Sequence, residues 1–243
     1  MKKLLVLFLV VSSAISFGQE TVVLRLNYKK GDVFKVNMAM SQEMGTEMSM
    51  GMNMDMDINV IDATEDTNTS EMRITKMTMD MLQGGNVMSF DSTKSDEELD
   101  PMALMMKTQM APMLQAVLTA KANNLGEVLE VTAEPNVPGM DEFANQTNVV
   151  YPKEALKVGS TWSFQKDEKG MILDFMYKVT SILKDKVDLE ITGKSSGLAT
   201  GDITGTMVVD RKSGVPLSSL IEMGLSIDGQ EMNSKVTMTM TKL

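Results

Sequence analysis

The residues with the clearest chemical potential in this sequence are methionines that recur at every second position. The stripe consists of Met48, Met50, Met52, Met54 and Met56, separated by polar or small residues. On one face of a strand, side chains with this spacing lie ~6.6–6.8 Å apart along the backbone. Thioether sulfur selects soft ions, so flexible arms that converge from the stripe would form a Cu(I) or Ag(I) site. The five methionines are therefore candidate metal ligands.

Other interpretations of the stripe stay open. It continues into Ile58 and Val60, and methionine recurs at residues 77–81 and 238–240. This recurrence favours core filling, because methionine is an adaptable gap-filler. The side chains would also suit a cavity that accepts variable apolar ligands. Oxidant scavenging through sulfoxide formation would instead require exposed sulfur. We favour core filling, with soft-metal binding as the alternative function.

Two absences exclude much other chemistry. The 243 residues contain no histidine and no cysteine, which removes Ser-His-Asp and Cys-His catalysis, imidazole metal sites and disulfides. The letters of residues 193–197 match G-x-S-x-G but lack a histidine base. The acidic residues 62–68 lack the glycine and terminal glutamate of a calcium loop, so we interpret them as a solvated turn. Paired carboxylates such as Glu97 and Glu98 fall in predicted surface segments. We predict a protein that is not an enzyme and needs no cofactor.

The charge balance limits the partners. The formal net charge is −10, whereas phosphate backbones require clustered lysine and arginine. We therefore expect no nucleic acid partner. The remaining candidates are an apolar ligand or a protein of the cell envelope.

The elements that must position the methionines are predicted strands. Residues 36–60 alternate apolar and polar side chains, which is typical of half-buried antiparallel strands, and we break them at a turn near residues 43–47. Glycine-containing turns predict further hairpins at residues 84–85, 210–214 and 228–229. Strands are also expected at residues 24–28, 171–183 and 187–192, the last two joined by a turn at residues 184–185. Trp162 begins another strand and is interpreted as a core anchor.

Only two segments look helical. Asp100 can cap a helix with Pro101 at its first position, and we expect that helix to end at Pro112. Residues 113–122 alternate like a strand that pairs with residues 127–131, and a second short helix is expected near residues 138–147. The fold class predicted is mainly β: a long antiparallel meander, open or half-barrel-like, with one or two covering helices.

The first 18 residues have the pattern of a secretory signal. Two lysines precede an apolar run of eight residues, which is too short to span a bilayer, and a stretch of small and polar residues ends at Gly18. We expect cleavage before Gln19, no transmembrane span in the mature chain, and a periplasmic or secreted protein. Residues 19–243 are predicted to form a single β-rich domain. A weak similarity between residues 30–34 and 158–162 leaves open two similar meander halves that meet near residues 133–158.

Several short motifs together resemble an uncharacterised family of exported bacterial β-rich proteins, a domain of unknown function. The motifs are the segments at residues 28–35, at 124–128, at 151–152 followed by 158–162, and at 210–214. The resemblance covers nearly the whole mature chain and implies an exported β-rich domain without an assigned activity. The predicted meander is also similar in architecture to the half-barrels of periplasmic lipoprotein carriers, which bind acyl chains. The expected function is thus a non-enzymatic binding or scaffold module with a methionine-lined apolar interior.

Overall fold

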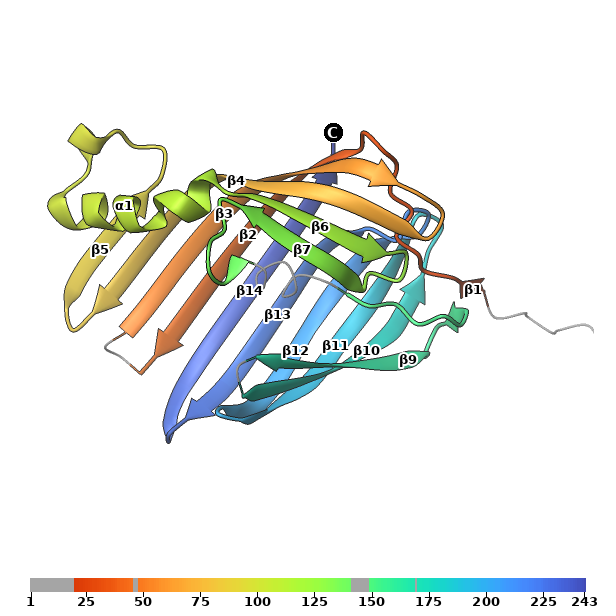
Figure 1. The fold of residues 1–243 in the computed structure, drawn as a ribbon. Coiled ribbons are helices and arrows are strands. Elements are labelled where there is room, and N and C mark those ends of the chain that lie inside the picture. The colour runs from red at the N-terminus through yellow and green to blue at the C-terminus, as the bar shows by residue number, and fades with distance from the viewer. Residues whose placement is uncertain (1–19, 46–47, 141–148, 169) are drawn as a thin grey trace, which may run out of the picture.

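The computed structural model describes residues 20–45, 48–140, 149–168 and 170–243, which form mostly β-strands (Figure 1). The helices that fall wholly within these residues are α1 (Pro101–Gln115) and the 3-10 helix η2 (Asp96–Glu98). The strands are β1 (Thr21–Val22), β2 (Val33–Met44), β3 (Met48–Ala63), β4 (Thr67–Gln83), β5 (Asn86–Asp91), β6 (Val117–Asn123), β7 (Val128–Glu134), β8 (Leu156–Lys157), β9 (Thr161–Glu168), β10 (Met171–Ile182), β11 (Lys186–Gly197), β12 (Thr200–Asp210), β13 (Pro216–Ile227) and β14 (Gln230–Lys242).

Twelve strands form one antiparallel sheet. Its order is β7-β6-β4-β3-β2-β14-β13-β12-β11-β10-β9, with β5 paired to the second half of β4. Strands β1 and β8 form a separate pair. The sheet remains open, because β7 and β9 at its two ends are not paired with each other (Figure 1). The predicted fold class, a long and open antiparallel meander with a helix, is confirmed.

The sheet consists of two runs of strands that meet in the middle. The first run is β2 to β7 and the second is β9 to β14, and the pairing of β2 with β14 places Met38 opposite Met238. The turns expected from the sequence predicted several pairs within each run, among them β2 with β3, β10 with β11 and β13 with β14, whereas the pairing of β4 with β6 was not predicted. The central pairing of β2 with β14 was not predicted either, because its two strands lie about as far apart in the chain as any two can. The alternative of two similar meander halves stays open.

A bulge in β4 keeps its apolar residues on one face. Asp55 pairs with Lys76, but the next residue of β3, Met56, pairs with Ile74, so Thr75 is an extra residue in β4. An extra residue reverses the alternation of side chains along a strand. Apolar residues therefore occupy even positions of β4 before the bulge and odd positions after it, and both sets point to the same face. We call this the inner face of the sheet.

Small residues on the inner face of β12 allow close approach of its neighbour. A Cβ atom on Gly201 would collide with the backbone carbonyl of Gly224, and one on Gly205 would collide with that of Leu220. Glycines at such positions permit a strand to bend where any side chain would hold the backbones apart.

The segment at residues 23–29, here the crossing segment, is not the strand predicted for residues 24–28. Its backbone instead connects two turns: the Leu26 amide donates to the Asn124 carbonyl at 2.8 Å, and the Asn27 amide donates to the Ser213 carbonyl at 2.8 Å. Asn124 follows β6 and Ser213 precedes β13. Side chains of the crossing segment alternate in burial because one side of the segment packs on the sheet, although its backbone is not paired as a strand of that sheet.

The helix begins as predicted and ends later. The Asp100 side chain accepts hydrogen bonds from the amides of Met102 and Ala103, and Pro101 occupies the first position. The predicted end at Pro112 is wrong, since α1 continues to Gln115. A proline removes one backbone hydrogen bond, but the residues after it, Met113 and Leu114, pack against the sheet. The strand predicted from residue 113 consequently begins at Val117.

The second predicted helix, residues 138–147, lies mostly outside the described residues. Met140 is described and buried, and it packs in a small cluster with Ala116 and Leu118. Its burial agrees with the apolar face that the sequence places at this position.

Two large apolar clusters fill the inner face. The aliphatic–aromatic cluster comprises Val22, Leu24, Val149, Tyr151, Leu156, Tyr177, Val179, Ile182, Val187, Leu189, Ile191, Met207 and Val209. The methionine cluster comprises Val36, Met38, Met54, Met56, Ile74, Met77, Met79 and Phe90, with further methionines of β3, β4, β14 and α1 packed against them. The first cluster lies on β10 to β12 and the second on β2 to β5, so the two runs of the sheet have different interiors.

Candidate functional site

Methionines form rows across the sheet as well as stripes along it. One row crosses four neighbouring strands and consists of Met77, Met54, Met38 and Met238, each directly paired with the next. Side chains directly opposite one another in an antiparallel pair have Cβ atoms ~4.5–5.5 Å apart. Thioether groups are therefore in contact laterally in this part of the inner face.

The five candidate metal ligands extend along β3 from an exposed end to a buried one. Met48 is 38% exposed, Met50 and Met52 are half-buried, and Met54 and Met56 are only 3% and 2% exposed. Because all five lie on one face of one strand, their Cβ atoms do not meet at a point. At the exposed end of β3, Met48 is instead grouped with methionines of two neighbouring strands. Met44 pairs directly with Met48 on one side and with Met232 on the other.

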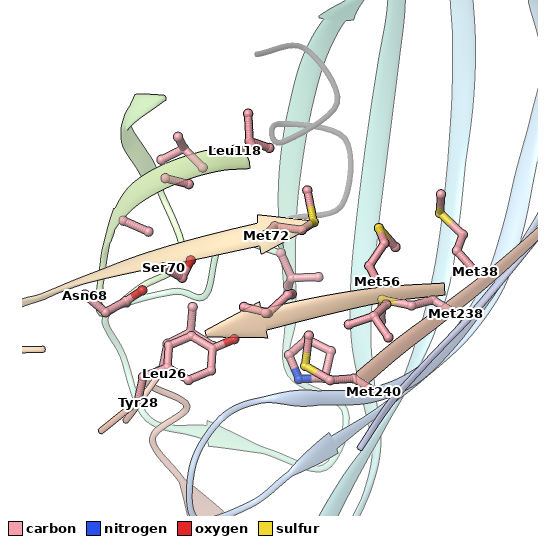
Figure 2. A pocket seen from close by; sticks show the side chains of 17 residues that line it. Leu26, Tyr28, Met38, Met56, Asn68, Ser70, Met72, Leu118, Met238 and Met240 are labelled. Atoms are coloured by element: carbon pink, nitrogen blue, oxygen red, sulfur yellow. The ribbon is translucent and has the colours of Figure 1, made fainter. Parts of the chain in front are cut away.

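A cavity of about 120 Å³ lies where the methionine cluster meets the crossing segment. The inner faces of β2, β3 and β14 form one side, and β4, β6 and the crossing segment face them (Figure 2). Methionines supply much of the lining, namely Met38, Met56, Met72, Met238 and Met240. The remainder is aliphatic except for Tyr28, Asn68 and Ser70, and no charged side chain lines the cavity among the described residues.

Asn68 is the most unusual group at the cavity. Its residue is only 6% exposed, and its side-chain Nδ2 has no hydrogen-bond partner among the residues that the structure describes. Asn68 is the second residue of β4, where its backbone pairs with Ala122 of β6. Buried amide donors are nearly always satisfied in proteins, so an unpaired one at a cavity requires an explanation.

Tyr28 is a second neutral polar group of the lining. Burial, and to a smaller extent the charge of Asp32, raises the pKa of Tyr28 to about 12. The ring makes an edge-to-face contact with Phe34 at 5.4 Å between centroids. In Figure 2 the hydroxyl points toward the methionine side of the cavity. At neutral pH the group is therefore a protonated, uncharged hydrogen-bond donor.

The sequence placed Asn68 in a solvated turn, and for this residue the prediction is wrong. Residues 62 and 64–66 are exposed as expected, but Asn68 is buried because β4 begins at Thr67. A signal existed in the sequence, since Asn68 and Ser70 have the same parity as Met72 and Ile74. Period-two alternation extended backwards from Ile74 would have placed both polar residues on the inner face.

Two other sequence candidates have structural roles. Ser195 of the G-x-S-x-G segment lies within β11, and its hydroxyl donates to the Ala199 carbonyl at 2.8 Å. A nucleophile elbow needs a strand-to-helix turn, which this position does not have. Trp162 stacks on Tyr177 at 5.1 Å between centroids, and its Nε1 donates to the Val150 carbonyl at 3.0 Å. The interpretation of Trp162 as a core anchor is confirmed.

Charged side chains line a separate hollow, among them Glu43, Asp202, Glu222 and Lys235. In the described part of the chain, no three Asp or Glu residues are grouped as a metal site would need. Within the same residues, no helix is long and apolar enough to cross a membrane.

Comparisons with known proteins identify the fold and no family. No family model matches the chain, and no curated protein matches it. Membership of the uncharacterised exported family therefore stays a prediction. Among solved structures, the fold is similar to that of lipovitellin, in a structure that describes lipid–protein interactions. The TM-score is 0.60 at 11% identity, and the match covers 88% of this chain but 25% of that one. The likeness is one of fold.

Proposed function

We propose that the protein is an exported, non-enzymatic binding module whose inner sheet face accepts an apolar ligand. The observation that carries the proposal is the uncharged cavity of about 120 Å³ beneath the crossing segment. A packed core normally leaves few voids larger than a water molecule. The similar sheet of lipovitellin, a protein whose lipid interactions have been described structurally, supports an apolar ligand.

The size of the cavity limits what enters it without rearrangement. Pockets for drug-sized ligands occupy ~300–1,000 Å³, whereas an apolar cavity of ~150 Å³ accepts benzene. A cavity of about 120 Å³ therefore takes one end or one small group of a ligand. Longer chains require movement of the methionines, whose unbranched thioether side chains readily change conformation.

The proposal is tested with a neutral fluorescent probe and a cavity-filling variant. We expect N-phenyl-1-naphthylamine to bind the wild-type protein and Ala120→Leu to weaken that binding at least tenfold, because Ala120 lines the cavity. Filling a void also stabilises a protein by ~0.5–2 kcal/mol, which urea unfolding measures. Ala155→Leu, at an exposed loop position, is the matched control. Absence of probe binding, with no lipid in a solvent extract of the purified protein, would contradict the proposal.

Export is tested by the mature N-terminus. We expect N-terminal sequencing of the protein from an envelope or culture fraction to begin at Gln19. A cytoplasmic protein that begins at Met1 would contradict the proposed export.

A second candidate function, Cu(I) or Ag(I) binding, is favoured by the three methionines at the exposed end of the inner face. Met44, Met48 and Met232 lie on adjacent strands at directly paired positions. We expect native mass spectrometry to show Ag(I) uptake that Met48→Leu with Met232→Leu abolishes. Met102 and Met105, both exposed on α1, provide the control double variant. Equal uptake by both double variants would exclude this site.

A further inference from the structure

We propose that the ligand presents an uncharged carbonyl, of an ester or an amide, to the Nδ2 group of Asn68. The inference rests on the proposed function and names the chemical class that the cavity selects. It starts from an unsatisfied donor that is part of the cavity lining and 6% exposed as a residue. An acceptor on the ligand would satisfy this donor, and carbonyl oxygen is an acceptor without a charge.

The lining disfavours the most common alternative, a free carboxylate. Within the described part of the chain, no lysine or arginine lines the cavity. A buried carboxylate without a cationic partner loses its hydration without compensation. Burial raises the pKa of Tyr28 and keeps its hydroxyl protonated at neutral pH, so both it and Asn68 can donate to a neutral oxygen.

The apolar part of the ligand has a defined direction. Asn68 and Ser70 lie on β4, whereas Met56, Met238 and Met240 lie across the cavity from them (Figure 2). A carbonyl at Asn68 would therefore direct its alkyl substituent toward the thioether groups. This arrangement separates one polar contact from an adaptable apolar surface, which is the usual composition of small-molecule sites.

The experiment is displacement of N-phenyl-1-naphthylamine by four probes of similar length. These are methyl octanoate, N-methyloctanamide, octanoate and octane, measured at pH 8. We expect the ester and the amide to displace the probe at concentrations at least tenfold lower than octanoate. Asn68→Leu should remove at least tenfold of the ester affinity and leave the affinity for octane within twofold. A preference between ester and amide distinguishes the two sources of the carbonyl.

Each outcome decides a different statement. If the fluorescent probe does not bind and a solvent extract of the protein contains no lipid, the proposed function fails. If the probe binds but octanoate displaces it as well as the ester does, or Asn68→Leu changes nothing, the carbonyl inference fails and the binding function stands. The wild-type protein gives an independent readout should Asn68→Leu not fold. The side-chain amide resonances of Asn68 should shift in ¹⁵N–¹H spectra with methyl octanoate and not with octane, and unchanged resonances with the ester would overturn the inference.

Discussion

The aliphatic–aromatic cluster and the methionine cluster lie on the same face of one sheet but fill it differently. The first has thirteen buried members, of which one is methionine, and five partly buried neighbours without methionine. The second has eight buried members, five of them methionines, and twelve partly buried neighbours, nine of them methionines. Branched side chains hold few rotamers, whereas methionine adopts many. The comparison indicates a rigid frame in one run of strands and an adaptable surface in the other, where the cavity lies.

The largest expected effect is a difference between truncations of the two clusters. Leu189 is 1% exposed and Met54 is 3% exposed. We expect Leu189→Ala to lower the free energy of unfolding by about 3–4 kcal/mol, and Met54→Ala by about 2 kcal/mol, because neighbouring methionines can move into the smaller void. Urea unfolding of both variants measures the difference. An equal or larger loss for Met54→Ala would remove the distinction between a rigid and an adaptable cluster.

A smaller effect is expected from removing one hydroxyl in each region. The Tyr151 hydroxyl donates to the buried Gly214 carbonyl at 2.8 Å, whereas the Tyr28 hydroxyl has no partner among the hydrogen bonds of the described residues. We expect Tyr151→Phe to cost about 1–2 kcal/mol, since it leaves a buried acceptor unpaired. Tyr28→Phe keeps the edge-to-face contact with Phe34 and should change stability by less than about 0.5 kcal/mol. Thermal or urea unfolding compares them, and similar losses would imply an unrecognised bond at Tyr28.

The smallest expected effect is on the free energy of unfolding at low pH. It is tested with one carboxylate from each region, Asp32 and Asp210. Burial alone would raise the pKa of Asp32, but the bonds from Lys242 and the Lys29 amide leave it below its usual value. Burial alone would also raise the pKa of Asp210. Hydrogen bonds from the Ser213 hydroxyl and amide outweigh burial and lower this pKa below its usual value. A lowered pKa in the folded protein contributes stability above the unfolded value of ~3.9, and this contribution is lost as the pH falls through the folded value.

We therefore expect the free energy of unfolding to decrease below about pH 4. Asp32→Asn and Asp210→Asn should each reduce stability at pH 7 by about 1 kcal/mol and each flatten the acid decrease. Added salt should weaken the Asp32 contribution more, because its partner Lys242 is charged while Ser213 is not. Urea unfolding between pH 2 and 7, with and without 0.5 M NaCl, measures both effects. An identical salt response would contradict the assignment of the Asp32 effect to Lys242.

Local features of the fold followed directly from the sequence. The alternation of residues 36–60 and the glycine turns at residues 84–85 and 228–229 predict the strands and hairpins that the structure contains. At these turns a positive φ is required, and Asp228 and Gly229 have values of 50° and 81°. Such features are encoded by near neighbours in the chain, so a pattern of a few residues predicts them.

Features that depend on contacts between distant parts of the chain could not be predicted from the sequence. Nothing near Pro112 indicates that α1 continues past it, because the stabilising contacts of Met113 come from the sheet. The extra residue Thr75 is visible only as a change in the parity of methionines, and its meaning depends on the pairing of β4 with β3. The sequence places Asn68 in an acidic turn, and only the pairing of β4 with β6 shows that this residue belongs to the sheet.

By itself the sequence determined that this is a methionine-rich antiparallel β-protein without imidazole or thiol chemistry, because composition and period-two alternation depend on the order of residues alone. Only the tertiary structure decided what the methionines do together. The pairing of β2 with β14 assembles their rows, and the crossing segment leaves a cavity beside Asn68. The physical reason is that packing and unmet hydrogen bonds are properties of groups brought together from distant parts of the chain.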